Sequence, residues 1–62
     1  MNIGLLGFGV VGRGVYEITT AREDMQVTKV LCLEDVNLPD AESVKDIKLI
    51  VEDPSIDTVV EA

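Results

Sequence analysis

The stretch Gly7-Phe8-Gly9-Val10-Val11-Gly12, close to the amino terminus, decides the fold and carries the spacing G-x-G-x-x-G. Before it, Asn2–Leu6 is aliphatic and stops at a glycine, which predicts a short buried strand. After it, apolar residues recur at i, i+4 and i+7. This period predicts a helix over Val10–Arg22 whose inward face carries Val11, Gly14, Val15 and Ile18. A glycine loop between a strand and a helix is the context that the spacing requires.

Each residue of the loop has a physical task in binding a dinucleotide. Gly7 allows the dihedral angles of a tight turn, and Gly9 leaves room for a pyrophosphate to approach the backbone. Gly12 lets the helix pack closely on the strand. The amides of Val10 and Val11 lie at the helix start, where N–H groups lack intrahelical partners. The loop therefore predicts a diphosphate site.

Two side chains near the loop leave alternatives open. Phe8 either lines the cofactor cleft or packs on its neighbours as a turn aromatic. Arg13 either reaches a phosphate or, as we favour, is a solvated charge on the outer helix face that it shares with Glu17 at i+4.

Two carboxylates, Glu34 and Asp35, follow the next apolar stretch about twenty residues beyond the glycines. A carboxylate at that distance binds the adenosine ribose hydroxyls and repels a 2′-phosphate. The alternative is a pair of solvated acids in an acidic chain. We expect Glu34 and Asp35 to take part in cofactor binding, and we expect NAD to be favoured over NADP. Arg13, or a lysine after Asp35 such as Lys45, could soften that preference by reaching the phosphate.

The rest of the chain continues the alternation of strands and helices. Gln26–Leu33 predicts a strand buried on both faces, and Thr58–Val60 predicts a third strand. Between them, Ser43 and Asp46 form a capping-box pattern for a helix over Val44–Glu52. The order βαβαβ predicts an α/β fold with a parallel sheet, half of a doubly wound Rossmann-type domain. We expect residues 1–62 to be the amino-terminal part of a dinucleotide-binding domain whose last strand is a sheet edge.

Composition excludes several classes of function. Five basic residues against twelve acidic ones give a net charge of −7, so nucleic acid and anionic membranes are unfavourable partners. Histidine is absent and Cys32 is the only cysteine, so we expect neither a metal site nor a disulfide. No apolar run is long enough to cross a bilayer. We expect a cytoplasmic protein.

Two segments together resemble the homoserine dehydrogenase family. The first is Gly4–Gly12 with Gly14 and Val15 after it, and the second is Asp53-Pro54-Ser55-Ile56-Asp57-Thr58-Val59-Val60-Glu61. The residues from 21 to 48 are similar only in pattern. The resemblance implies an NAD(P)-dependent oxidoreductase of amino-acid biosynthesis that interconverts homoserine and aspartate 4-semialdehyde. It also implies cofactor contacts at Phe8, Gly9, Val10 and Val11.

The resemblance assigns no catalytic residue to this chain, because the family's catalytic lysine and acids belong to a later substrate domain. We therefore expect the small-molecule substrate to be bound through a domain absent from this chain, and we expect residues 1–62 alone to be inactive. We expect the full-length parent to form a homo-oligomer. Where many members read Val-Arg-Asp, this chain reads Leu33-Glu34-Asp35, which supports the preference for NAD. The alternative function is a nucleotide-sensing Rossmann-like regulatory module, which does not account for the Asp53–Glu61 segment.

Overall fold

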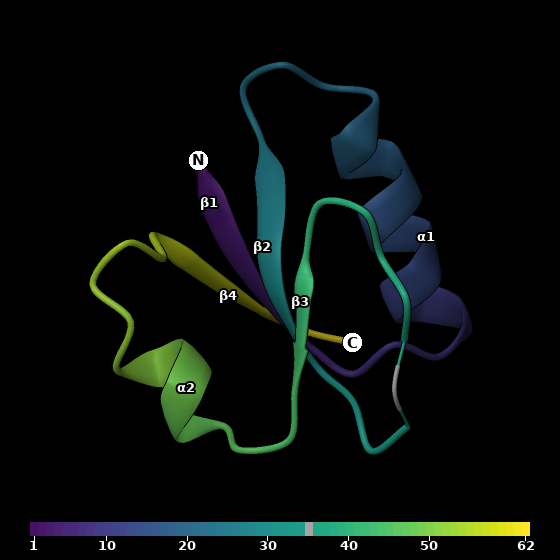
Figure 1. Ribbon diagram of the computed structural model, residues 1–62. Helices are drawn as coiled ribbons and strands as arrows, with labels where there is room; N and C mark the ends of the chain where they lie inside the picture. The colour runs from purple at the N-terminus through teal and green to yellow at the C-terminus, as the bar shows by residue number, and fades with distance from the viewer. Residues whose placement is uncertain (35) are drawn as a thin grey trace.

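The chain folds around one parallel sheet, and the computed structural model describes residues 1–34 and 36–62. The elements in chain order are β1 (Asn2–Leu6), α1 (Val10–Thr20), β2 (Gln26–Leu31), β3 (Glu42–Val44), α2 (Lys48–Val51) and β4 (Thr58–Glu61). All strand pairs are parallel, and the strands lie in the order β3-β2-β1-β4. Helix α1 lies on one side of the sheet and α2 on the other (Figure 1). The predicted α/β class with a parallel sheet is confirmed.

The region from residue 42 to residue 52 corrects the prediction of a single helix over Val44–Glu52. Glu42–Val44 is a strand that pairs with β2, with Leu31 opposite Val44, and the helix is limited to Lys48–Val51. The predicted capping residue Ser43 lies within β3, so it caps no helix. Burial of Val44, which is 4% exposed, together with ladder pairing outweighs the local capping pattern. The helix start is instead bound by Asp46, whose Oδ1 accepts a hydrogen bond of 2.9 Å from the Lys48 amide.

The strand order reverses between β1 and β4. From β1 the chain moves outward to β2 and β3, and it then returns to the other side of β1 to form β4. As predicted, the last strand is at an edge of the sheet, where it pairs with β1 alone. Open α/β sheets bind ligands outside the carboxyl ends of their strands at such a reversal, which here lies at the carboxyl ends of β1 and β4.

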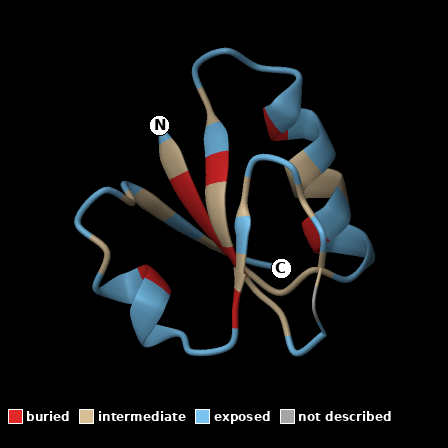
Figure 2. Cartoon of the chain, viewed as in Figure 1, coloured by how far each residue is buried: buried red, intermediate tan, exposed pale blue. Residues whose placement is uncertain are grey.

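The core lies between the sheet and α1 and is built on Ile3, Leu5, Val27 and Val30. Val27 and Val30 are three residues apart, so a regular strand would place them on opposite faces. The pairing of β1 with β2 shifts by one residue between Ile3 and Gly4, and this irregularity brings both valines to one face. The buried segments of β1 and β2 lie at the centre of the molecule in Figure 2.

The orientation of α1 differs from the predicted inward stripe. Val11 and Ile18 are each 66% exposed, whereas Gly12 and Thr19 are buried. A Cβ atom at Gly12 would overlap the carbonyl oxygen of Gly7, so the loop requires this glycine to face the sheet. That contact sets the rotation of the helix and turns part of the apolar stripe to solvent. Gly14, predicted to lie against the sheet, has no atom within 4 Å of the position of a Cβ.

The opposite face of the sheet is covered by the single turn of α2. Ile50, which is 1% exposed, packs against Gly4 of β1, where a Cβ atom would overlap its Cγ2 atom. Ile56 also lies within van der Waals distance of that position. The glycine of β1 therefore permits close packing on this side, which keeps β1 buried between two layers.

Candidate functional site

The loop from Gly7 to Gly9 leaves the carboxyl end of β1 and turns into α1. Gly7 has a φ of 104°, a region that side-chain-bearing residues avoid, and its amide donates a hydrogen bond of 2.9 Å to the Leu31 carbonyl oxygen. A Cβ atom here would also lie 2.7 Å from the carbonyl oxygen of Ala62. Both the backbone conformation and the space around it therefore require glycine at this position.

Gly9 has a different reason to be glycine. Its φ of −80° and ψ of −152° are extended values that other residues adopt, and it is the residue that caps α1. No atom lies within 4 Å of the position of a Cβ, so the space above it is open. Nothing in the fold itself excludes a side chain here, and the open space is consistent with a ligand that approaches the backbone.

The first turn of α1 offers backbone amides that have no acceptor inside the helix. The first intrahelical bond runs from the Arg13 amide to the Gly9 carbonyl oxygen at 2.9 Å, so the amides of Val10, Val11 and Gly12 have no acceptor within the helix. No side chain caps this end, and the first turn contains no acidic residue. Val10 is 92% exposed and Val11 is 66% exposed. The helix dipole and these amides together favour an anion at this position.

An open groove of about 1010 Å³ lies along the carboxyl edge of the sheet. It contains four segments from different parts of the chain: the end of β1 with the loop as far as Gly9, the end of β2 as far as Glu34, the segment Lys45–Ile47 after β3, and Glu61 with Ala62 after β4. The groove therefore lies at the point where the strand order reverses. Aliphatic side chains, the glycine backbone and the carboxylates of Glu34, Asp46 and Glu61 line it.

The structure places the predicted site residues in three positions. Gly7, Phe8, Gly9 and Glu34 line the groove, Val10 and Val11 begin α1 directly after Gly9, and Gly12 lies against the carbonyl of Gly7. Asp35, predicted with Glu34 to bind the ribose, lies outside the described residues. Glu34 is exposed and is carried to the groove by the end of β2.

Lys45, predicted from the sequence only as a lysine that could reach a 2′-phosphate, lies in the same groove. Its Nζ donates a hydrogen bond of 3.1 Å to the carbonyl oxygen of Leu33, one residue before Glu34. The register of β3 against β2 brings it there, because Leu31 pairs with Val44. A sequence pattern that assigned these residues to a helix could not indicate this contact. One local signal for this arrangement is Val44, because a β-branched residue favours a strand, and a strand ending at Val44 leaves Lys45 just beyond its carboxyl end.

Phe8 packs on its neighbours, as the second alternative predicts, and it also borders the groove. The residue lines the groove, and its ring also packs edge-on against Tyr16, with centroids 5.9 Å apart and planes at 73°. The guanidinium carbon of Arg13 lies 5.0 Å from the Phe8 ring centroid. The loop aromatic is therefore attached to α1 while it borders the groove.

The segment Asp53–Asp57 lies outside the groove and has a structural role. Asp53 Oδ2 forms an ion pair of 2.8 Å with Lys29 Nζ, and Oδ1 accepts hydrogen bonds from the amide and hydroxyl of Ser55. The hydrogen bond from Lys29, followed by those from Ser55, lowers the pKa of Asp53 to about 2. Asp57 Oδ2 accepts a hydrogen bond of 2.8 Å from the Asn2 amide. These carboxylates connect α2 and β4 to β1 and β2.

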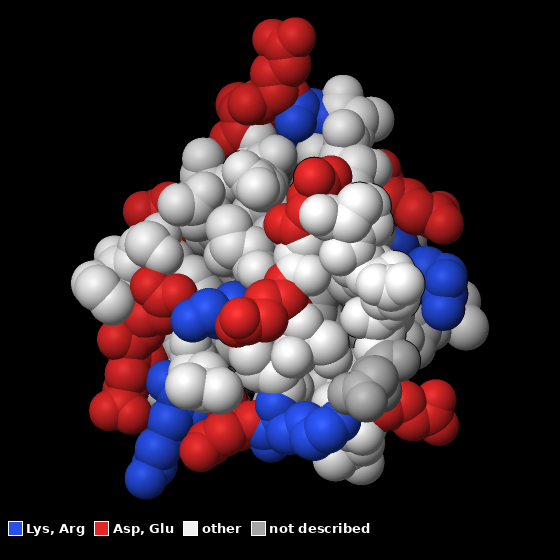
Figure 3. Space-filling view, viewed as in Figure 1, with Lys and Arg blue, Asp and Glu red and all other residues white. Residues whose placement is uncertain are grey.

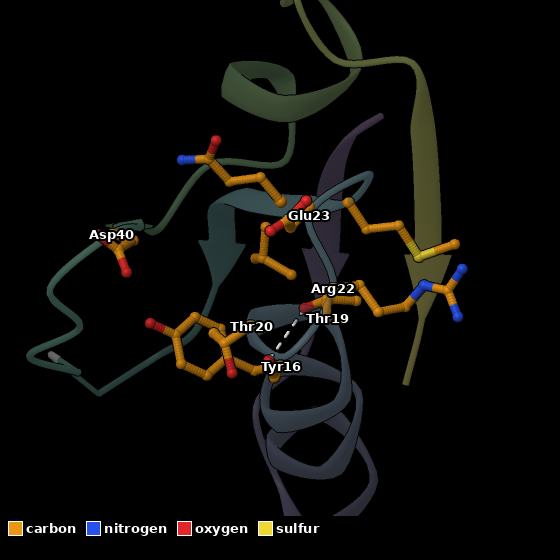
Figure 4. A pocket seen from close by; sticks show the side chains of 9 residues that line it. Tyr16, Thr19, Thr20, Arg22, Glu23 and Asp40 are labelled. Atoms are coloured by element: carbon orange, nitrogen blue, oxygen red, sulfur yellow. Dashed lines mark hydrogen bonds between the residues drawn. The ribbon is translucent and has the colours of Figure 1, made fainter.

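A second cavity, of about 320 Å³, lies at the far end of α1 from the glycine loop. Figure 4 shows its lining by the last turns of α1, including Tyr16, Thr19 and Thr20, with Asp40 across from them. Thr19 is 4% exposed, and its hydroxyl donates to the Tyr16 carbonyl oxygen at 3.0 Å. None of the predicted site residues lines this cavity.

The surface shows no concentration of positive charge on the face drawn in Figure 3, where basic side chains are dispersed among acidic ones. Within residues 1–34 and 36–62, no helix is long and apolar enough to cross a membrane. In the same residues, no three His, Cys, Asp or Glu side chains are grouped so that they could hold a metal ion.

Comparisons with protein families, with curated proteins and with solved structures give no match for this chain.

Proposed function

We propose that this chain binds the ADP-containing part of NAD or NADP in the groove at the carboxyl edge of the sheet. The observation that carries the proposal is one juxtaposition. The open backbone of Gly9 and the unpaired amides of the first turn of α1 lie at the same edge as Glu34. The amides are suited to a diphosphate and the carboxylate to ribose hydroxyls, so one dinucleotide satisfies both.

The topology supports the same proposal. The order β3-β2-β1-β4 is the order of the first four strands in the doubly wound dinucleotide-binding fold, and the glycine loop follows β1 in that fold. We propose that residues 1–62 are the amino-terminal part of such a domain. The groove of about 1010 Å³ lies where that fold binds its ligand.

The wider function that we propose is the cofactor-binding segment of an NAD-dependent oxidoreductase resembling homoserine dehydrogenase. The nicotinamide would exchange a hydride with the substrate, and the residues of this chain would bind and orient the diphosphate and the ribose. The residues at the glycine loop and at Asp53–Glu61 support this proposal through their resemblance to that family. The Asp53–Asp57 contacts explain in physical terms why those carboxylates would be needed, since they hold the strands together.

The test of binding is a titration of the chain with NAD, followed by calorimetry and thermal unfolding. At a ligand concentration about 100 times Kd, binding to the folded state alone would raise the free energy of unfolding by about 2.7 kcal/mol. Gly9→Val is expected to abolish binding without unfolding the chain, since Gly9 has extended dihedral angles and open space around it. Gly14→Val is the matched control, because Gly14 also has open space but lies outside the groove.

Wild-type binding that Gly9→Val leaves unchanged would place the diphosphate elsewhere. Absence of binding by the folded wild-type chain would overturn the proposal. The oxidoreductase part is tested separately, in a longer protein that contains these residues. That protein is expected to reduce NAD when homoserine is added, whereas residues 1–62 alone are expected to show no turnover. NAD binding without any such activity in the longer protein would favour a nucleotide-sensing module.

A further inference from the structure

Arg13 is the fourth residue of α1, and its side chain lies over the ring of Phe8 in the glycine loop. The guanidinium carbon is 5.0 Å from the ring centroid. Helical side chains lean toward the amino terminus of the helix, so a long side chain at this position extends back over the first turn. The same ring contacts Tyr16, about one turn further along α1. The guanidinium is therefore held near the loop by an aromatic contact that is itself attached to the helix.

The position of this charge is unfavourable for the helix alone. Cations stabilise the carboxyl end of a helix, whereas the amino end is the positive end of its dipole. Glu17 lies four residues away, at a spacing that allows ion pairs, yet no carboxylate among the described residues lies within 4.0 Å of the Arg13 guanidinium. The chain has twelve acidic residues and five basic ones. Arg13, one of the five basic residues, therefore has no ionic partner among the described residues. It lies where the free amides of the helix start already attract anions. Such a local conflict is of the kind found at functional positions.

The space around the guanidinium adjoins the proposed binding site. A cavity of about 480 Å³ is lined by Arg13, Gly14 and Glu17 of α1, by Val10 in the first turn, and by Phe8 and Gly9 of the loop. Phe8 and Gly9 also line the large groove. A guanidinium at this boundary is placed to approach an anion bound at the loop, and its planar array of donors is suited to phosphate oxygens.

We propose that Arg13, held against Phe8, binds the diphosphate of the ligand at the glycine loop. This inference rests on the proposed function and adds a residue to it. The backbone amides supply directional hydrogen bonds, and Arg13 supplies the full positive charge that a strongly acidic chain otherwise lacks at this position. Binding of a diphosphate would also resolve the electrostatic conflict between this cation and the helix dipole.

The test uses two probes, ADP-ribose with its diphosphate and adenosine without one, and measures the affinity of each by calorimetry. Arg13→Gln is expected to weaken ADP-ribose binding about tenfold, the loss of a charge-assisted contact, and to leave adenosine binding unchanged. Arg13→Lys is expected to restore part of the affinity, because it keeps the charge but loses the planar donors. The loss is expected to shrink between about 0.01 M and about 1 M salt, as the Debye length falls from ~30 to ~3 Å.

Arg22→Gln is the matched control, because it changes the net charge equally at the far end of α1, where Arg22 pairs with Asp24 at 3.0 Å. Equal effects of the two substitutions would reduce the role of Arg13 to net charge and overturn the inference. Equal loss of both probes in Arg13→Gln would show that Arg13 only supports the loop. If Arg13→Gln does not fold, Arg13→Met keeps the long side chain and provides the same comparison.

Wild-type binding of ADP-ribose that Arg13→Gln does not change would overturn this inference and leave the proposed function standing. Failure of the wild-type chain to bind ADP-ribose would overturn both.

Discussion

At the scale of single residues, the glycines of the loop have separate physical reasons. Gly7 is required by its positive φ and by the carbonyl of Ala62, and Gly12 is required by the carbonyl of Gly7. Gly9 is required by neither, since its dihedral angles are extended and its surroundings open. The fold itself therefore does not explain why position 9 is glycine. The diphosphate proposal supplies a reason, because a side chain there would block the ligand from the backbone.

Glu34 carries the prediction of cofactor choice. At ~4 Å and an effective dielectric near 20, two like charges repel by ~4 kcal/mol. Solvent and salt reduce this to about 1–2 kcal/mol, which corresponds to a roughly five- to thirtyfold preference for a ligand without a 2′-phosphate. We expect the chain to bind NAD more tightly than NADP, with Lys45 in the same groove softening the difference. Paired titrations with NAD and NADP measure the preference.

Glu34→Arg is expected to reverse this preference by removing the repelling charge and supplying a partner for the phosphate. Glu23→Arg makes the same change of charge at the far end of α1, outside the groove, and is expected to leave the preference unaltered. A wild-type chain that prefers NADP, with Glu34→Arg unchanged, would mean that Glu34 faces solvent and does not contact the ribose.

At the scale of elements, β3 shows how tertiary pairing replaces a local pattern. Ser43 is followed three residues later by Asp46, and this spacing predicts a helix cap. In the structure Ser43 pairs with Val30 of β2, and its hydroxyl is buried without a hydrogen-bond partner within the described residues. Asp46 receives the amide of Lys48 instead. Of these two residues, only Asp46 binds the start of α2.

This difference gives opposite expectations for two alanine substitutions. Ser43→Ala is expected to leave stability unchanged or to raise it by up to about 1 kcal/mol, because it removes an unsatisfied buried hydroxyl. Asp46→Ala is expected to lower stability by about 0.5–2 kcal/mol, the usual cost of losing a capping side chain. Urea unfolding of both variants measures the two free energies. A loss in Ser43→Ala as large as the loss in Asp46→Ala would support the capping box instead of the strand.

The ion pair of Asp53 with Lys29 makes the stability of the folded chain depend on pH. The pKa of Asp53 is about 2 in the folded chain, below the value of about 3.9 for an unfolded aspartate. Between these values the unfolded state binds more protons, so the stabilisation is complete above about pH 4 and is lost as the pH falls toward about 2. Asp53→Asn is expected to be less stable than wild type at pH 7, with the difference shrinking across that window.

Unfolding measured as a function of pH for both chains checks this expectation. Lys29→Gln and the double variant complete a cycle, in which the coupling between the two positions should disappear at low pH. A constant difference between wild type and Asp53→Asn from pH 7 to about pH 2 would show that the carboxylate charge contributes nothing to folding.

At the scale of the whole molecule, the core is small and β4 is an edge strand. The hydrophobic side chains that are buried are Ile3, Leu5, Val27, Val30, Val44 and Ile50. Chains below about 70–80 residues rarely gain more than about 3–5 kcal/mol from a single core. The stability of the fold therefore depends on a few buried residues in β1 and β2, on which other elements pack from both sides of the sheet.

Leu5→Ala is expected to cost about 2–5 kcal/mol, because Leu5 has no exposed surface and its removal leaves a cavity. That loss is comparable with the whole stability expected of a chain this size, so most of the variant should be unfolded at 25 °C. Leu33→Ala is the matched control, since Leu33 is 91% exposed. Circular dichroism and thermal unfolding measure both. A cooperative transition near the wild-type temperature in Leu5→Ala would contradict this view of the core.

The sequence by itself determined the elements whose signals are local. Strand β1, the glycine loop, the start of α1 and the last strand follow from aliphatic runs and from glycines within a few residues of one another. The parallel arrangement followed from their alternation. The placement of Phe8 and Gly9 at the carboxyl edge was predictable for the same reason, because a loop after a parallel strand must emerge there.

Only the tertiary structure decided the features that depend on residues far apart in sequence. Gly12 lies against the carbonyl of Gly7 and near Ala62, fifty residues later, and this packing exposes Val11 and Ile18, which the helical period had placed inside. Pairing with β2 made Glu42–Val44 a strand and brought Lys45 beside the groove. The period of a helix shows that it has an apolar face, but the contacts that the face makes come from the rest of the chain.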